Sequence, residues 1–409
     1  MSLLLTSCAQ PCCLPVADPL ASLRSSTLSP YASLGAKDLD TPSTRQLNME
    51  AAVQSMVLLK NEGGLLPLAK GAKLAILGPH FNSTQDLLSD YSPGHWWAHS
   101  PLMAAQALDK AGEISLVGGA QGCTLEGTNT SGIAAAVALA KAADVAVIFV
   151  GLTRTCCRSR VGASARAAAC SDARALASAN KDPTNSGTPP VVATGSALES
   201  EGHDRTDIDL QGQQTALINA VLAVNKKIIV VLIHGGALDV SNVVAPAILD
   251  AHYPGQLGGD AVLRTLLNMH KAAPAGRLTT TTYQQSFTQR PMSDMSMANI
   301  TYKHYTGAPV YPFGYGLSYS TWTVQWHNSS QHRRVSIDSM ERAHSEYFAA
   351  VASGRDGWRS PAAYSATITN TGGVTSDYVL LGFVSSPQRR LSDPLEPVLL
   401  NFPGCEFLK

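Results

Sequence analysis

The amino-acid sequence predicts an α/β fold built on a mostly parallel sheet, and two observations support this prediction. First, short apolar segments without clear alternation recur along the chain, as in strands that are buried on both faces. They are KLAILGP (73–79), ISLVGG (114–119), VAVIFVGL (145–152), KIIVVLIHGG (227–236) and PAILDAHYPG (246–255). Second, helix-like segments separate these strands, which is typical of a parallel sheet with helices on both faces. We therefore expect a three-layer αβα sandwich.

The segments between the strands have the apolar spacing and the terminal residues of helices. They are SPLMAAQALDKAG (100–112), TSGIAAAVALAKAAD (130–144), LQGQQTALINAVLAVN (210–225) and GGDAVLRTLLNM (258–269). Upstream, STRQLNMEAAVQSMVLLK (43–60) repeats apolar residues at helical spacing, which predicts one further helix. Ligands of such sheets bind beyond the carboxyl ends of the strands. The loops that follow Leu77, Val150, Ile233 and Ala251 are therefore the expected functional loops.

A different pattern begins after residue 310. VYPFGYGLSYSTWTVQW (310–326) predicts a turn that leads into a strand, and AAYSATITNTGGVTSDYVLLGFV (362–384) predicts strands around an Asn-Thr-Gly-Gly turn. A charged stretch at about 327–360 is expected to be irregular. We assign 1–29 to an irregular N-terminus, 30–50 to a linker, 51–316 to the α/β domain and 317–409 to a partial β-sandwich. Within the α/β domain, the Ala-, Ser- and Arg-rich residues 153–197 are expected to be a disordered insertion.

Composition excludes several classes of function. Lys and Arg number 30, as do Asp and Glu, so no basic excess predicts a nucleic-acid or acidic-membrane partner. The longest apolar runs are far shorter than the roughly 20 residues that span a bilayer. The N-terminus lacks the basic region of a signal peptide, although four Asn-X-Ser/Thr sequons favour a secretory route. The cysteines, histidines and glycines match no zinc or nucleotide motif, so neither metal nor cofactor is expected.

The segment ALESEGHDRTDIDLQGQQ (197–214) carries the candidate site. Glu199, Glu201 and Asp204 precede Arg205 directly before a predicted helix. One interpretation is a solvated loop with ion pairs at a helix N-terminus. The other is acid catalysis, because glycosidases use two carboxyl groups, one of which protonates the leaving oxygen. In an extended segment Glu199 and Glu201 lie on one face, so this cluster supplies at most one catalytic carboxyl group.

These residues belong to an ordered set of segments that resembles the C-terminal part of a glycoside hydrolase family 3 enzyme, closest to the β-xylosidase branch. The set includes VLLKNEGGLLPL, LAILGP, TSGIAAAVALAKAADVAVIFVGL, ESEGHDR with GQQ, VVLIHGGALDVS, YPGQLGG and VYPFGYGLSYS, and SATITNTG resembles the family's fibronectin type III-like tail. The resemblance implies retaining hydrolysis of terminal non-reducing β-D-xylosyl, glucosyl or arabinosyl residues from oligosaccharides, in an extracellular enzyme of xylan catabolism. It implies no cofactor or metal.

The resemblance also implies roles for single residues. In this family a (β/α)8 barrel precedes the α/β domain and supplies the nucleophilic Asp, while the α/β domain lends the acid/base Glu. Glu199 matches that Glu, the first acid of an ExExxDR pattern. Glu201, Asp204 and Arg205 match the positions that follow and are expected to shape the loop.

Two departures from the family pattern qualify this expectation. No barrel-like pattern precedes residue 30, and no residue matches the nucleophile, so we expect the isolated chain to have little activity. The insertion at 153–197 lies directly before Glu199 and is a candidate to displace its loop. The alternative function is a non-catalytic domain that binds carbohydrate or docks a partner.

Overall fold

The computed structural model describes residues 34–35, 38, 40–88, 98–153, 199, 205–291, 293–327, 336–352, 366–384 and 398–399. Met1–Asn48 and Met49–Lys409 are separate units, and the architecture below is that of the second. The predicted N-terminal segment 1–29, and the predicted insertion apart from Thr153, lie outside the described residues.

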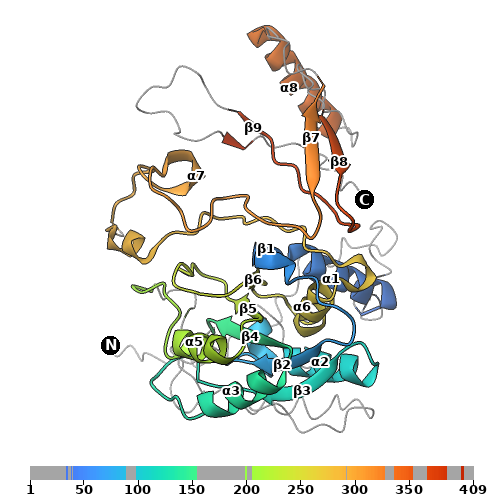
Figure 1. The fold of residues 1–409 in the computed structure, drawn as a ribbon. Coiled ribbons are helices and arrows are strands. Elements are labelled where there is room, and N and C mark those ends of the chain that lie inside the picture. Colours follow the sequence, from blue (N-terminus) through green and yellow to red (C-terminus); the bar gives the residue numbers. More distant parts are fainter. Residues whose placement is uncertain are drawn as a thin grey trace, which may run out of the picture. The chain divides into compact units, whose positions relative to one another are not determined.

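Strands β1–β6 of this unit form a six-stranded sheet (Figure 1). In spatial order the strands are β1 (Val57–Asn61), β6 (Ala247–Asp250), β5 (Ile228–Ile233), β4 (Val145–Gly151), β2 (Lys73–Leu77) and β3 (Ser115–Ala120). Only the β1–β6 pairing in this sheet is antiparallel, and the other four pairings are parallel. Every residue of β4 and β5 is buried, as their uninterrupted apolar sequences predict. The predicted α/β class with a mostly parallel sheet is confirmed.

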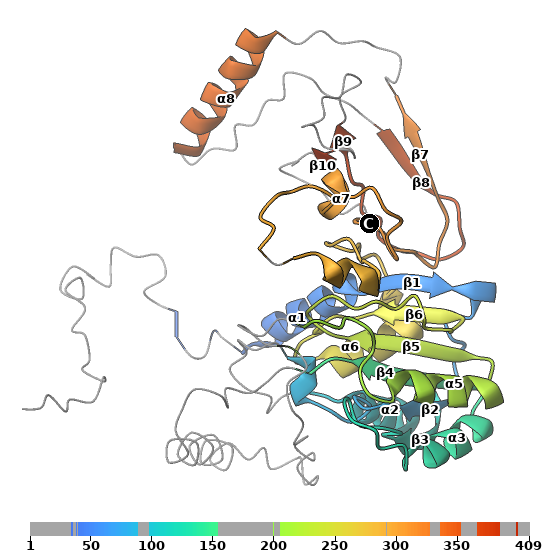
Figure 2. The same cartoon turned by 90° about the vertical axis from the view of Figure 1, so that its left-hand side faces the viewer.

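Helices cover both faces of the sheet and complete the three layers (Figure 2). On one face lie α3 (Ile133–Ala142) and α5 (Gln214–Val224); on the other lie α2 (Pro101–Lys110), α6 (Gly258–Leu266) and the buried Ala52 of α1 (Pro42–Ser55). The alternation of β4 divides the core, since Ile148 and Val150 pack on the first face while Val147 and Phe149 pack on the second. The helices cover the faces of the sheet, so the carboxyl ends of its parallel strands are bordered by loops.

Two predicted segments differ from the structure. The single helix expected over 43–60 ends at Ser55, and Val57–Asn61 instead forms an edge strand of the sheet. Pairing with β6 determines the conformation of this apolar run, whose composition alone suits a helix equally well. The stretch expected to be irregular at about 327–360 contains α8 (Ile337–Ala352), so that prediction was wrong there. This helix contains four Ala and two Glu among its 16 residues, and both residue types are strong helix formers.

The C-terminal part contains two short antiparallel pairs. β7 (Trp322–Trp326) pairs with β8 (Ala366–Asn370), and β9 (Phe383–Val384) pairs with β10 (Val398–Leu399). The shorter helical elements of the chain are η3 (Glu62–Gly64), η4 (Gln85–Leu87), η5 (Met269–Lys271), η6 (Gln285–Gln289) and α7 (Thr301–His304). The small antiparallel sheet fits a partial sandwich, while its fibronectin-like character and the domain boundaries stay predictions. Among the described helices, none has the length and apolarity needed to traverse a bilayer.

Candidate acid/base site

The loops at the carboxyl edge of the sheet meet around Glu199. Thr153 follows β4, Gly235 and Gly236 follow β5, and Tyr253 follows β6. Each of them contacts Glu199 directly, and the loop after β2 supports Thr153 from behind. The site is thus assembled from segments that the parallel topology brings to one edge.

The Glu199 side chain is half-buried and accepts three hydrogen bonds. The N–H of Gly235 donates to Oε1 and the N–H of Gly236 donates to Oε2, each over 2.7 Å. The Tyr253 hydroxyl group also donates to Oε1. Successive backbone N–H groups of this kind form an anion-binding concavity. A Cβ atom at Gly236 would lie 2.6 Å from Glu199 Oε2, so a larger residue here would require the carboxylate group to move.

The backbone of Glu199 is held as well. Its N–H donates to the Thr153 carbonyl oxygen over 3.1 Å. Thr153 in turn donates from its hydroxyl group to Asp86 Oδ1 over 2.6 Å, and Ser83 donates to Asp86 Oδ2 over 2.7 Å. His80 Nδ1 lies 3.3 Å from the same Oδ2 atom. Glu199 is therefore connected to a buried polar network under the sheet edge.

The buried Asp86 remains ionised within this network. Burial alone raises the pKa of its carboxyl group, but the adjacent His80 ring and the hydroxyl groups of Thr153 and Ser83 lower that pKa from 3.8 to about 2. The negative charge is thus compensated by groups that also order the loop around Thr153.

Arg205, which follows Glu199 in the sequence, holds the chain through hydrogen bonds to two carbonyl oxygens. One guanidinium nitrogen donates to the Ala237 carbonyl oxygen, and the other terminal nitrogen donates to the Asp207 carbonyl oxygen over 3.3 Å. Burial lowers the pKa of Arg205, while Glu199, Asp207 and Tyr253 oppose this change. These contacts join Arg205 to the loop after β5 and to its own loop, and its loop-shaping role stays a prediction. Glu201 and Asp204 lie outside the described residues.

Gln214 gives the GQQ segment a structural role that the sequence did not reveal. Its fully buried amide group accepts from Gly151 N–H over 2.7 Å and donates to the carbonyl oxygens of Gly151 and Leu125 over 2.9 and 3.0 Å. The Gln214 side chain therefore joins the start of α5 to Gly151 at the end of β4. Gly151 lies two residues before Thr153.

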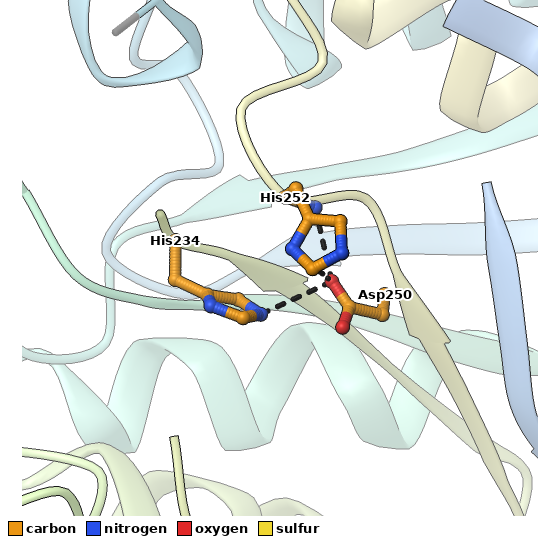
Figure 3. A group of neighbouring side chains, drawn as sticks. All are labelled: His234, Asp250 and His252. Atoms are coloured by element: carbon orange, nitrogen blue, oxygen red, sulfur yellow. Dashed lines mark hydrogen bonds and ion pairs between the residues drawn. The ribbon is translucent and has the colours of Figure 1, made fainter. Parts of the chain in front are cut away.

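Next to the Glu199 loop, His234, Asp250 and His252 form a compact cluster (Figure 3). Asp250 Oδ1 lies 3.1 Å from His234 Nε2 and 3.4 Å from His252 Nδ1. Burial lowers the pKa of His234, but Asp250, the Gly236 carbonyl group and Glu199 raise it more, so the net shift is upward. Burial also lowers the pKa of His252. For this residue the effect of burial is larger than the opposing effect of Asp250, so the net shift is downward.

The sequence interpretation singled out Glu199 and Arg205 but not most of the groups that contact them. The two glycines contribute only backbone groups, and Tyr253 lies far along the chain. The available signal was the position of these residues in loops already expected to be functional, after Ile233 and Ala251.

Comparison with known proteins identifies the lineage. The sequence profile of the glycosyl hydrolase family 3 C-terminal domain matches residues 56–319. Exo-1,4-beta-xylosidase bxlB of Emericella nidulans is 33% identical over 394 residues, which cover 93% of this chain and 43% of that protein. The probable exo-1,4-beta-xylosidase bxlB of Aspergillus terreus is 32% identical over 370 residues, or 87% of this chain and 40% of that protein. The chain thus spans less than half the length of these relatives.

Solved structures agree with these relatives. The GH3 exo-beta-xylosidase XlnD, determined with a xylobiose aziridine activity-based probe, aligns with a TM-score of 0.66 and 26% identity over 91% of this chain and 43% of that one. The GH3 beta-glucosidase of Bifidobacterium adolescentis aligns with a TM-score of 0.65 and 25% identity over 92% of this chain and 47% of that one. The chain therefore belongs to glycosyl hydrolase family 3 and carries the C-terminal domain of that family.

Proposed function

We propose that this chain supplies the acid/base carboxyl group of a retaining, β-xylosidase-like glycoside hydrolase, and that Glu199 carries this group. The substrate would be an oligosaccharide or glycoside that ends in a non-reducing β-D-xylosyl residue, outside the cell. The main support is the position of Glu199 at the carboxyl edge of the sheet, where Gly235, Gly236 and Tyr253 hold its carboxylate group. The xylosidase names of the relatives support the substrate class.

In this proposal Glu199 acts twice. As a carboxylic acid it protonates the glycosidic oxygen of the leaving group, and as a carboxylate it then deprotonates the water that releases the sugar. The nucleophile and the sugar subsite come from a (β/α)8 barrel, which the family places before this domain. Without them a positioned acid contributes about 10²–10⁴-fold, far below the rate enhancement of a complete glycosidase.

The contacts of Glu199 impose a condition on this role. Both carboxylate oxygens accept hydrogen bonds from backbone N–H groups, so in this conformation both oxygens face the glycine loop. For Glu199 to protonate a sugar oxygen, at least one oxygen must leave the glycine N–H groups when the barrel and substrate are engaged. The proposal therefore includes a movement of the carboxyl group toward the substrate.

The same contacts favour a second candidate, in which the domain is non-catalytic. A carboxylate that accepts three hydrogen bonds is well suited to brace the loops after β4, β5 and β6. The domain would then bind carbohydrate or dock a partner, with Glu199 as a structural anchor.

A chimeric enzyme distinguishes the two candidates. The segment of the Emericella nidulans relative that aligns with this chain is replaced by the chain itself, and hydrolysis of β-xylosides is measured with and without Glu199→Gln. An acid/base role predicts a large loss of kcat/KM for a poor leaving group such as xylose in xylobiose. It predicts a much smaller loss for an activated aryl leaving group that departs without protonation.

Azide provides the second measurement, since it attacks the glycosyl intermediate without a general base. Added azide should restore turnover of the aryl substrate by the Glu199→Gln chimera and give the glycosyl azide. Glu62→Gln, at an exposed glutamate, is the control and should retain full activity with both leaving groups. Equal losses for both leaving groups, without azide rescue, would refute the catalytic role and favour the anchor.

A further inference from the structure

We propose that His234, Asp250 and His252 form a binding site for a divalent transition-metal cation of the Zn²⁺ type. The three side chains come from the ends of two neighbouring strands, β5 and β6 (Figure 3). Each offers one ligand atom, and the three atoms lie within 4.8 Å of one another. Among the described residues, these three form the cluster of His, Cys, Asp and Glu side chains whose ligand atoms lie close enough together to hold a metal ion.

The distances to Asp250 suit such an ion. His234 Nε2 and His252 Nδ1 lie 3.1 and 3.4 Å from Asp250 Oδ1. A tetrahedral ion with bonds of about 2.0–2.2 Å to nitrogen and oxygen holds its ligand atoms about 3.4 Å apart. The separations to Asp250 already match this value, while the widest separation in the group, up to 4.8 Å, must shorten when a cation binds.

His234 is already oriented as a ligand by its second ring nitrogen. Its Nδ1 lies 2.7 Å from the Gly236 carbonyl oxygen, which can only accept, so Nδ1 carries the hydrogen. This bond fixes the ring orientation and directs Nε2 at Asp250. Metal-binding histidines are typically held in this way, because a partner on the second nitrogen fixes the tautomer and raises the basicity of the first.

His252 provides the access to solvent and shows backbone strain. Its backbone has φ of +48°, in the left-handed region that non-glycine residues rarely occupy. Such strain persists where the surrounding structure enforces it, and it is common at ligand sites. The His252 side chain is 38% exposed, whereas those of His234 and Asp250 are 9% and 5% exposed. A cation can thus reach the buried ligands from the His252 side, with a fourth position left open.

The donor set indicates the class of cation. Two imidazoles and one carboxylate suit Zn²⁺ and neighbouring transition metals, whereas Ca²⁺ and Mg²⁺ prefer sites made of oxygen ligands alone. The charge also fits, since Asp250 is negative and the Glu199 carboxylate is close enough to influence His234. A bound cation would also fix Gly236, which holds Glu199, because Gly236 accepts from His234.

The test is a titration of the full chain, freed of metal with a chelator, with Zn²⁺ in competition against a chromophoric chelator. We expect one Zn²⁺ per chain with a dissociation constant below about 1 μM. Asp250→Asn and His252→Asn should each weaken binding at least about 100-fold, because each removes one of three ligands. Asparagine also tolerates the positive φ of residue 252, so the second variant keeps the backbone conformation.

His99→Asn is the matched control, since His99 also pairs with an aspartate, Asp260, over 2.8 Å. It should leave Zn²⁺ affinity unchanged. Circular dichroism establishes whether each variant folds. X-ray absorption of the wild-type Zn²⁺ complex needs no variant and should show two imidazole ligands and no sulfur. Absence of stoichiometric binding, unchanged affinity in both folded ligand variants, or sulfur among the ligands would each overturn the proposal.

Discussion

Replacing Asp86 with asparagine tests the network that supports the Glu199 loop. Asp86 accepts hydrogen bonds from Thr153 and Ser83 and lies beside His80, and these groups lower its pKa from 3.8 to about 2 against the opposing effect of burial. A shift of this size corresponds to about 2 kcal/mol of folding stability at neutral pH. Asp86→Asn keeps the shape of the side chain and removes its charge, so we expect the free energy of unfolding to fall by about 2 kcal/mol at pH 7.

The stability contributed by Asp86 should decrease as the pH falls. Because the pKa of Asp86 is lower in the folded chain, its contribution is complete above the unfolded value of 3.8 and is lost as pH falls through about 2. The difference in unfolding free energy between wild type and Asp86→Asn should therefore narrow to about 1 kcal/mol at pH 3. Urea denaturation followed by far-UV circular dichroism at pH 7, 5 and 3 measures this difference directly.

A double-mutant cycle with Thr153→Val separates the hydrogen bond from general loop effects. Asp86 and Thr153 share a 2.6 Å bond to a charged group, so their coupling energy should be about 1 kcal/mol at pH 7. Amide exchange at Glu199 should also accelerate in Asp86→Asn, because its N–H depends on the Thr153 carbonyl group. A difference that does not change with pH, together with additive single effects, would refute the ionised network.

Two further substitutions test the contacts that hold the site together. Gly236→Ala places a Cβ atom 2.6 Å from the Glu199 carboxylate and should break one charge-assisted hydrogen bond. Amide exchange at residue 236 should therefore rise about 30-fold. The control Gly373→Ala adds a Cβ atom in open space and should change the exchange rate at residue 236 little. Gln214→Met leaves buried backbone groups of Gly151 unpaired and should lower the free energy of unfolding by about 3 kcal/mol in the same urea assay. The control Gln213→Met, at a half-exposed neighbour, should lower it by less than about 0.5 kcal/mol. Unchanged exchange in the first variant, or equal losses in the two glutamine variants, would contradict the contacts described.

Much of the sheet was predictable because burial on both faces leaves a clear record in sequence. β4 and β5 are apolar throughout and appear in the structure within a few residues of their predicted ranges. The edge strand β1 was not predictable, because Val57–Leu59 continues the helical spacing of α1, and only its pairing with β6 distinguishes the two conformations. Here a long-range contact overrides a local pattern.

The candidate site was predictable only where its chemistry lies in one segment. Glu199 and Arg205 stand close together in sequence, and the edge rule for parallel sheets separately indicated the loops after β5 and β6 as functional. The other groups come from separate loops, and the two glycines act through N–H groups that every non-proline residue possesses. The His234 cluster has no motif spacing, since its members meet only because β5 and β6 are adjacent.

The long insertion before Glu199 raises the question of whether it displaces the acid loop, and the hydrogen bond from Glu199 N–H to the Thr153 carbonyl oxygen bears on this question. Thr153 is the one described residue of the predicted insertion at 153–197, and Glu199 is the next described residue, so this hydrogen bond joins the two residues that flank 154–198. Once the ends of a loop are fixed, each doubling of its length adds only about 0.6 kcal/mol of closure entropy. The Asp86 network and the glycine N–H groups fix these two ends. We therefore expect the length of segment 154–198 to leave Glu199 in place, because the contacts at its two ends hold the carboxyl group.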